Sequence, residues 1–435
     1  MRPMHRRAGA AASAPLKFGD AFSSFGIAMG FLDFLFNRKP SPDDFAVLFE
    51  SAARKAGFKG ELTYRPREFR LVYGESAFFN LHNAYREYCS QRGARRRETL
   101  NNYIAALCEN QRSRALPLDE ARPLLLPVIR SRGMIEELRL HQVRTEGDDL
   151  DFSPVYLPMG DDAVVLLAID HPESTATLVQ GPDKSWGITL EEGLAIALTN
   201  LRDTTADSFV EVVPGLFRGD WNDSYDISRI FLPDVLERLP LKGRPVFMVP
   251  SRETLLVTGD HDGHALAAMV ELGLQAASEG RAISTGLYCY EDGKVATYPV
   301  QHPLLQARLA RMRYLTTKNE YDTQKHALDL IHQENSTDIF VANYQLYAAQ
   351  EDPDLLFSIA SWTEGVDSLL PRVDRLVLVR PNEDCSDAET RAVSWEQAMA
   401  LLGDLLEEAP GFYPPRYRTL GFPEPSRAEL LDEVN

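Results

Sequence analysis

The sequence has few cysteines and no long apolar run. Its four cysteines, Cys89, Cys108, Cys289 and Cys385, are scattered without a CxxC spacing. This argues against a zinc ribbon, a thioredoxin motif or a disulfide framework and predicts free thiols in a reducing compartment. The longest apolar run, residues 163–169, falls far short of the roughly 18 residues that span a bilayer and is typical of a buried strand. We therefore expect a cytoplasmic protein with no membrane association.

Short catalytic signatures are missing as well. The chain has no GxxxxGK[ST], GxGxxG, GxSxG or HExxH sequence, which argues against a P-loop NTPase, a Rossmann dehydrogenase, an α/β-hydrolase and a zincin. These absences do not exclude an enzyme whose active site has no short sequence motif. From these absences we predict no catalytic residue, no cofactor and no metal.

Charge is distributed unevenly along the chain. The formal net charge is −18, yet residues 1–145 hold 24 Lys and Arg against 15 Asp and Glu, and the remainder holds 22 against 49. A basic N-terminal region suits an acidic partner, a nucleic acid or the acidic remainder of the same chain. The overall acidity argues against nucleic-acid binding by the whole molecule. A protein partner is the interpretation we favour.

Length and composition predict an α+β protein of several domains. A chain of 435 residues with 44% hydrophobic and 25% charged residues is typical of about three globular domains. The expected parts are an extension over 1–40, a mostly helical, basic domain over 41–145, a middle domain with a mixed sheet over 146–303, and an α/β layer over 304–435. The N-terminus lacks the continuous apolar stretch of a signal peptide, so a start at Met29 after an extension is the preferred interpretation.

Local signals place the individual elements. Ser41 as N-cap and Pro42 at the first position begin a helix that Gly57 ends. Capping boxes of the type Thr189–Glu192 and Ser394–Gln397 begin two more helices, the second continuing through residue 408. Further helices are expected near 80–90, 98–112, 119–126, 225–236, 264–279 and 320–334. Strands are expected over 69–73, 163–169, 175–179, 209–213, 245–251, 254–259, 338–350, 355–362 and 374–381, with a hairpin around 291–293 and an irregular tail after residue 410.

The stretch 225–263 holds the best candidate for an anion site. Pro250 cannot donate to a strand ladder, so the corner at Ser251 and Arg252 should leave the sheet. An arginine at such a corner can grip a phosphate or carboxylate with two parallel hydrogen bonds. Arg229, from the preceding helix, is the second candidate for the same anion.

The carboxylates of this stretch allow a structural interpretation instead. Arg252 or Arg229 can pair with Asp226 or Asp260 and lock the helix to the hairpin, and this is the role we favour. Asp260 and Asp262 also belong to a run of acidic and histidine side chains, 260–264, that resembles a metal site. A strand-to-helix turn capped by Asp262 explains that run better.

Two further groups of charged residues, the arginine run 95–97 and the pair Glu291 and Lys294, could be functional but have simpler structural explanations. Arg95, Arg96 and Arg97 lie near tyrosines in the sequence, a composition that can bind single-stranded nucleic acid by stacking, but a charge run between helices is more often a solvated loop. Glu291 and Lys294 are one residue too far apart for a nuclease motif and are expected at a solvated hairpin tip.

Four segments of the middle region resemble a known family. They are WGITLEEGLAIALTNL (186–201), YDISRIFLPDVL (225–236), PVFMVPSRETLLVTGDHDG (245–263) and LYCYEDG (287–293). In this order they resemble the bacterial YtpQ-like family, the domain of unknown function 1444, over about residues 41–303. The resemblance implies a cytoplasmic bacterial protein and gives no established activity. Residues 1–28 and 304–435 lie outside it.

These observations leave three functions open. The leading expectation is a non-enzymatic binding or adaptor protein. The alternative is an enzyme acting on a phosphorylated or carboxylated small molecule in a cleft near Ser251 and Arg252. In that enzyme Arg252 and Arg229 hold the anion, and Asp226 or Asp260 serves as base or metal ligand. The second alternative is single-stranded nucleic-acid binding through the arginine cluster. The oligomeric state is open.

Overall fold

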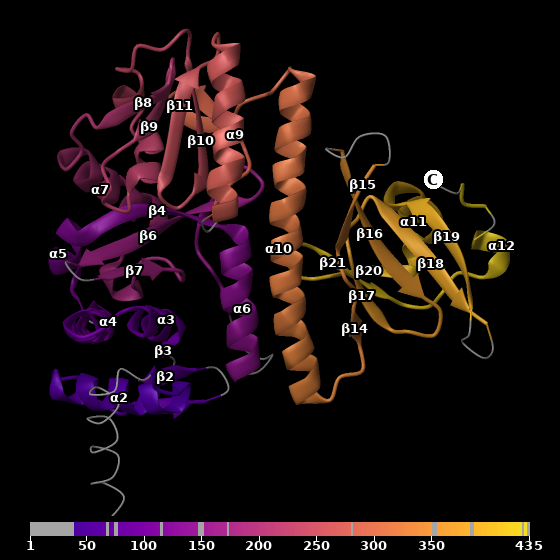
Figure 1. Ribbon diagram of the computed structural model, residues 1–435, viewed down its shortest axis with the longest axis horizontal. Helices are drawn as coiled ribbons and strands as arrows, with labels where there is room; N and C mark the ends of the chain where they lie inside the picture. The colour runs from indigo at the N-terminus through magenta and orange to yellow at the C-terminus, as the bar shows by residue number, and fades with distance from the viewer. Residues whose placement is uncertain are drawn as a thin grey trace, which may run out of the picture. The chain divides into compact units, whose positions relative to one another are not determined.

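The computed structural model contains two compact units (Figure 1). One unit comprises Met1–Leu116 with His171–Ser174, and the other comprises Pro117–Asp170 with Thr175–Asn435. The combination of helices with several sheets confirms the α+β class. The described residues are 39–66, 69–73, 77–113, 116–146, 152–171, 174–279, 282–349, 355–382, 387–428 and 430–432. Almost all of the expected extension, and Cys385, lie outside them.

The first unit packs helices on a small antiparallel sheet. Its elements are α2 (Pro42–Lys55), β1 (Thr63–Arg65), β2 (Arg70–Tyr73), β3 (Ala77–Asn80), α3 (His82–Ser90) and α4 (Ala94–Ser113), with sheet order β1-β2-β3. Ser41 begins α2 as expected, because its hydroxyl oxygen accepts from the N–H of Asp44 at 3.1 Å. Phe45, Phe49 and Leu71 are fully buried in its core, so the apolar stripe of α2 faces the sheet.

The second unit begins with a sheet covered by α7. Its elements are α5 (Leu118–Ala121), η1 (Arg122–Leu124), β4 (Leu125–Ser131), α6 (Arg132–Glu146), β5 (Leu157–Met159), β6 (Ala163–His171), β7 (Ser174–Leu178), η2 (Lys184–Trp186) and α7 (Leu190–Asp203). The order is β4-β6-β5, with β7 also on β6. The capping box is confirmed: Thr189 Oγ1 accepts from Glu192 N at 3.2 Å, and Glu192 Oε2 accepts from Thr189 N at 2.8 Å. The helix expected over 119–126 is present as α5 and the 3₁₀ helix η1 up to Leu124 and is wrong only for residues 125–126, because β4 begins there and pairs with β6 along its whole length.

A larger antiparallel sheet follows in the order β13-β12-β10-β11-β9-β8. Its elements, with the helices between them, are β8 (Phe209–Val213), β9 (Leu216–Gly219), η3 (Asp226–Phe231), α8 (Pro233–Leu236), β10 (Pro245–Ser251), β11 (Thr254–Gly259), α9 (Gly263–Glu279), β12 (Tyr288–Glu291) and β13 (Lys294–Thr297). The helix expected over 225–236 is divided into a 3₁₀ turn, η3, and a short α8, since Pro233 starts a new helical turn. The hairpin expected around Asp292 and Gly293 is present.

The C-terminal part of this unit is built on a long helix and two mixed sheets. The elements are α10 (Pro303–Asn335), β14 (Phe340–Val341), β15 (Gln345–Ala348), β16 (Leu356–Thr363), β17 (Ser368–Pro371), β18 (Arg375–Pro381), β19 (Ala388–Ser394), α11 (Trp395–Leu402), η4 (Gly403–Leu405), β20 (Leu406–Ala409), β21 (Arg416–Thr419) and α12 (Pro425–Ala428). The sheets have the orders β14-β17-β21-β20 and β15-β16-β18-β19. Pairing is parallel between β14 and β17 and between β16 and β18.

Two expectations for this C-terminal part are wrong. The helix that Ser394 begins ends at Leu402, and the residues expected to continue it form β20 instead. The tail expected to be irregular contains β21 and α12. The two strands have one cause, because β20 and β21 pair with each other and so complete a sheet that begins at β14.

Helices α6 and α10 lie side by side (Figure 1) and position the site described below. Gln324 Nε2 donates to Glu136 Oε1 at 3.1 Å, and the Arg144 guanidinium donates to both oxygens of Glu334 at 2.7 and 3.0 Å. Arg416, which is fully buried, donates to Gln324 Oε1 at 2.6 Å and so fixes the same glutamine to β21. In the part of the chain that the structure describes, no helix is both long and apolar enough to cross a membrane.

Candidate functional site

The expectation that the corner leaves the sheet after Pro250 is wrong, because β10 continues through Ser251, which is paired with Thr254 of β11. The register of the two strands shifts between Met248 and Ser251, because Pro250 has no N–H for the ladder. The Pro250 carbonyl accepts from Ile283 N at 3.0 Å instead. Ser251 is buried, and its hydroxyl donates to Thr254 Oγ1 at 2.9 Å, which closes the turn. Ser251 therefore shapes the corner rather than presenting its hydroxyl to a ligand.

Arg252 projects from this corner into a cavity. Its side chain is partly buried, and no hydrogen bond or ion pair to its guanidinium is found among the residues that the structure describes. The cavity beside it has a volume of about 460 Å³. A guanidinium with five donors and no internal acceptor, held at a cavity wall, is available for a ligand.

The other walls of the Arg252 cavity are mostly polar. Helix α10 supplies a stripe of side chains spaced to share one helix face, namely Thr316, Asn319, Glu320, Thr323, Gln324 and Ala327. Helix α6 supplies Gly133, Met134, Glu136, Glu137 and Leu140. Arg130, Ser131, Thr175, Thr177, Ala277, Ala282, Ile283 and Tyr413 complete the lining.

Glu320 lies against the first turn of α6. A Cβ at Gly133 would stand only 2.7 Å from Glu320 Oε1, so the glycine is what lets the carboxyl group approach. Burial and, to a smaller extent, the nearby Asp162 carboxylate raise the pKa of Glu320 to about 8. The Arg132 guanidinium and the Gly133 N–H act in the opposite direction and only partly offset this rise. At neutral pH this carboxyl is therefore mostly protonated and can donate a hydrogen bond.

Asp162 fixes the wall that faces Glu320. Its two oxygens accept from the Ser284 hydroxyl and from the N–H and hydroxyl of Thr285, each at 2.7 Å. These bonds hold the segment that carries Ile283 into the lining. The ring of Tyr413 stacks on the Arg132 guanidinium at 4.3 Å and closes the same end of the cavity.

The charges of the cavity favour an anion. The buried Arg130 guanidinium donates to the Ile129 carbonyl at 2.8 Å and keeps its positive charge at the wall. Glu136 is neutralised by Arg139, whose Nε lies 2.7 Å from its Oε2. Glu320 is mostly protonated as well, and Glu137 is exposed to solvent. Among the described residues no carboxylate pairs with Arg252, so its positive charge is available at the cavity wall.

Arg229, the second anion candidate, is used internally. Its side chain is fully buried, donates to both oxygens of Asp223 at 2.6 and 3.0 Å, and stacks on Trp221 at 4.3 Å. Burial alone would raise the pKa of Asp223, but the Arg229 guanidinium and the Tyr225 N–H hold it below its usual range. The structural interpretation had proposed that Arg229 pairs with Asp226 or Asp260. It pairs with neither, because Asp223 is its partner, and it is not available to a ligand.

The three predicted carboxylates have structural partners away from Arg252. Asp226 accepts from Trp221 N at 3.0 Å and Asn222 N at 3.3 Å. Asp260 accepts from Arg244 N at 2.8 Å and Nε at 3.0 Å. Asp262 accepts from Lys242 Nζ at 2.7 Å and from Ala265 N at 3.2 Å, so it caps α9. Within the described residues no group of three or more His, Cys, Asp or Glu side chains is arranged for a metal ion.

The arginine cluster is partly structural too. Arg96 is buried and donates to the carbonyls of Tyr88 at 3.1 Å and Gln91 at 2.9 Å. Only Arg95 and Arg97 of the three are exposed. The cluster therefore joins α3 to α4 rather than forming a continuous basic surface.

Sequence reasoning missed Glu320 and the polar stripe of α10. The expected helix began at residue 320, so Thr316 and Asn319 were not placed on it. The signal was present, because the six stripe residues follow the spacing i, i+3, i+4, i+7, i+8 and i+11. A polar face of that length on a long helix indicates a wall of a cleft or an interface.

Comparisons with protein-family models, with curated proteins and with solved structures found no match. The geometry of the Arg252 cavity is accordingly what a functional assignment depends on. The cavity has the Arg252 guanidinium, which finds no acceptor among the described residues, the buried Arg130 guanidinium, hydroxyl and amide groups, and the protonated carboxyl of Glu320.

Proposed function

We propose that this protein binds a small phosphorylated or carboxylated molecule in the Arg252 cavity. The observation that carries the proposal is the guanidinium of Arg252, which lines the cavity and has no acceptor among the described residues. Leaving such a group without a partner in a partly buried position is costly unless water or a ligand accepts from it.

The cavity offers more than one contact to such a ligand. Arg252 can bind an anionic group through two parallel hydrogen bonds. The hydroxyls of Thr175 and Thr177, the Asn319 amide and the protonated Glu320 supply weaker, orienting contacts. A volume of about 460 Å³ lies within the range of small-molecule sites, roughly 300–1,000 Å³.

The raised pKa of the Glu320 carboxyl supports catalysis as a second candidate function. A carboxyl whose pKa is raised to about 8 can donate and accept a proton near neutral pH, which is what a general acid or base needs. In this version Arg252 holds the anion and Glu320 transfers the proton. Turnover of a bound molecule that stops in Glu320→Gln, while binding persists, distinguishes this function from binding alone.

We also propose that residues 41–303 belong to the YtpQ-like family and that the protein resides in the bacterial cytoplasm. The order of the four quoted segments supports the family. Cys89, Cys108 and Cys289 are free thiols, which supports a reducing compartment. The part after residue 303 supplies the α10 wall of the Arg252 cavity, so a related chain that lacks it would lack this site.

The test of binding is thermal unfolding of the protein with a panel of phosphorylated and carboxylated metabolites. A ligand at about 100 times its dissociation constant adds roughly 2.7 kcal/mol of stability and raises the melting temperature. We expect Arg252→Gln to abolish that rise and Glu253→Gln, at the exposed neighbouring position of the same turn, to retain it. An unchanged melting temperature throughout the panel, or an equal rise in Arg252→Gln, contradicts the proposal.

A further inference from the structure

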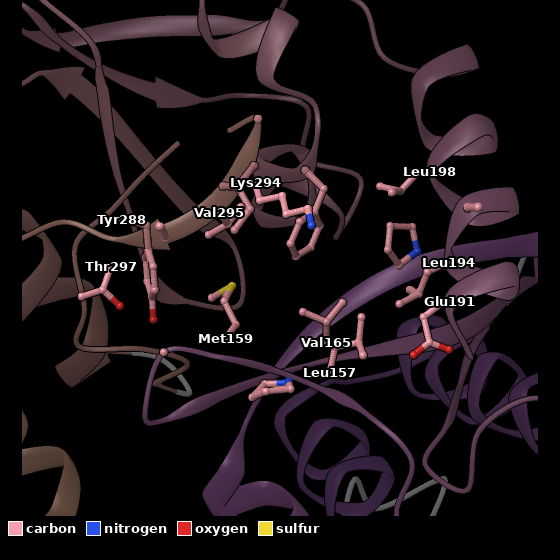
Figure 2. A pocket seen from close by; sticks show the side chains of 18 residues that line it. Leu157, Met159, Val165, Glu191, Leu194, Leu198, Tyr288, Lys294, Val295 and Thr297 are labelled. Carbon is pink, nitrogen blue, oxygen red and sulfur yellow. The ribbon is translucent and has the colours of Figure 1, made fainter. Parts of the chain in front are cut away.

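A second cavity, of about 570 Å³, lies elsewhere in the same unit (Figure 2). It shares none of its described lining residues with the Arg252 cavity. Its walls are mostly apolar and come from β5, β6, α7, η3 and the β12–β13 hairpin, with Leu157, Met159, Val165, Leu194, Leu198, Ile230, Phe231 and Val295 among them. The volume and the apolar walls are those of a small-molecule site.

Two strand edges face this second cavity. Side chains alternate between the faces of a strand, yet the consecutive residues Leu157–Met159 of β5 and Lys294–Thr297 of β13 all line it. Both strands are therefore turned edge-on to the cavity, in agreement with their terminal positions in the two sheets. The cavity thus meets backbone as well as side chains.

The β12–β13 turn determines which backbone groups of β13 are unused. Asp292 and Gly293 have φ values of 49° and 72°, as in a two-residue hairpin turn, and Glu291 is paired with Lys294. Hydrogen-bonded and non-hydrogen-bonded pairs alternate from this closing pair, so the N–H and C=O of Val295 point away from β12. They supply one donor and one acceptor at an otherwise apolar wall.

Lys294 gives the second cavity a positive end. Its side chain extends across the upper side of the cavity in Figure 2, and no carboxylate pairs with it in the described part of the chain, even though Glu291 is opposite in the hairpin. Glu191, on the α7 wall, lies in the first turn of that helix, where the helix dipole already stabilises its negative charge. The lining thus holds two charged side chains, the Glu191 carboxylate and the Lys294 ammonium, and both are exposed to solvent. Lys294 directly precedes Val295, so the ammonium and the Val295 N–H belong to the same part of the hairpin.

We propose that this second cavity binds a small amphiphilic carboxylic acid, with its hydrocarbon chain between β5, α7 and η3 and its carboxylate at Lys294. The apolar walls fit the chain, and the ammonium group together with the Val295 N–H fits the head. The inference is independent of the Arg252 cavity and of the function proposed for it.

Calorimetric titration with octanoate, decanoate and decanol tests the contribution of the ligand's hydrocarbon chain separately from that of its carboxylate head group. Each buried methylene adds about 0.8 kcal/mol, or roughly fourfold in affinity, so decanoate should bind about 15-fold more tightly than octanoate. Lys294→Gln should weaken decanoate about tenfold and leave decanol unchanged, since it removes a charge-assisted hydrogen bond. Equal effects on decanoate and decanol, or tighter binding of decylamine than of decanoate, overturn the assignment of the head group.

Blocking the cavity tests its location. Ala195 of α7 lines the cavity and is exposed, and Ala195→Trp should abolish decanoate binding. Thr199→Trp is the matched control, because Thr199 is exposed one helical turn later and does not line the cavity. Circular dichroism melts establish that both variants are folded. Full decanoate affinity in a folded Ala195→Trp variant, or no binding to the unaltered protein, overturns the proposal.

Discussion

The carboxyl group of Glu320 occupies the space that a side chain at position 133 would take. An added Cβ at Gly133 would lie 2.7 Å from Glu320 Oε1, 3.0 Å from Cγ and 3.1 Å from Cδ. The contact joins the middle of α10 to the first turn of α6 and defines one wall of the Arg252 cavity. Glycine at 133 is therefore required by the position of Glu320.

Gly133→Ala should move Glu320 with little loss of stability. The glutamate can swing into the cavity, and the gain in helix propensity, up to about 1 kcal/mol, offsets the strain. The free energy of unfolding should change by no more than about 1 kcal/mol, while the pKa of Glu320 falls toward its ordinary value because the group becomes hydrated. NMR titration of the labelled glutamate carboxyl groups measures this pKa.

Gly263→Ala is the control for that substitution. Gly263 also stands at the start of a helix, but nothing lies within 4 Å of an added Cβ there. This variant should leave the titration of Glu320 unchanged. A Gly133→Ala protein that retains the raised pKa would contradict the contact described above.

The titration of Glu320 should also appear in the pH dependence of stability. A carboxyl whose pKa is raised in the folded protein, here to about 8, stabilises the fold fully below its unfolded pKa and loses that contribution as pH rises through the folded value. Between about pH 5 and 8 this group lowers the free energy of unfolding by at most about 1.4 kcal/mol per pH unit. Glu320→Gln, which imitates the protonated acid, should remove that slope. Urea unfolding at several pH values checks this, and parallel profiles for the two proteins would count against it.

The pair of Asp223 and Arg229 should contribute strongly to stability. Arg229 is fully buried and Asp223 is its carboxylate partner at 2.6 Å, so Asp223→Asn leaves a buried cation without its counter-charge. We expect a loss of about 3 kcal/mol in the free energy of unfolding by urea. Asp207→Asn is the matched control, since Asp207 and Arg238 form an exposed pair at 2.9 Å whose loss should cost less than about 1 kcal/mol. Equal losses in the two variants would refute the structural role of Arg229.

Local sequence signals predicted many of the elements correctly. Ser41 and Thr189 begin helices through short-range hydrogen bonds that depend only on residues up to three positions away. The turn at Asp292 and Gly293 depends on backbone conformations that these two residues tolerate. Such features are encoded within a few residues and are independent of the rest of the fold.

Elements that depend on distant partners were missed. The residues of β20 follow a helical apolar pattern, yet they pair with β21, a partner that no local pattern predicts. The start of α10 was placed at residue 320, although the helix begins at Pro303. For β20, tertiary packing decides between the helix that its local pattern favours and pairing with a strand about ten residues away.

The candidate site was predictable only in its corner. Pro250 predicted an interruption before Ser251 and Arg252, and the register of β10 and β11 does shift there, although Ser251 stays paired with Thr254 and the chain does not leave the sheet. The opposite wall depends on the packing of α6 against α10, so Glu320 could not be assigned to the site from the sequence. Arg229 was indistinguishable from Arg252 by pattern, and only burial against Trp221 separates their roles.

The central claim is that Arg252 binds an anion in its cavity. Its most direct test is the dissociation constant of the tightest-binding anion of the metabolite panel, measured by calorimetry across substitutions of Arg252. Loss of a charge-assisted, two-pronged contact of roughly 1.5–3 kcal/mol should weaken binding about 10- to 100-fold in Arg252→Gln, and less in Arg252→Lys. Glu253→Gln should bind as the unaltered protein does. A dissociation constant that is the same in all four proteins would contradict the account, because the anion would then be bound without Arg252.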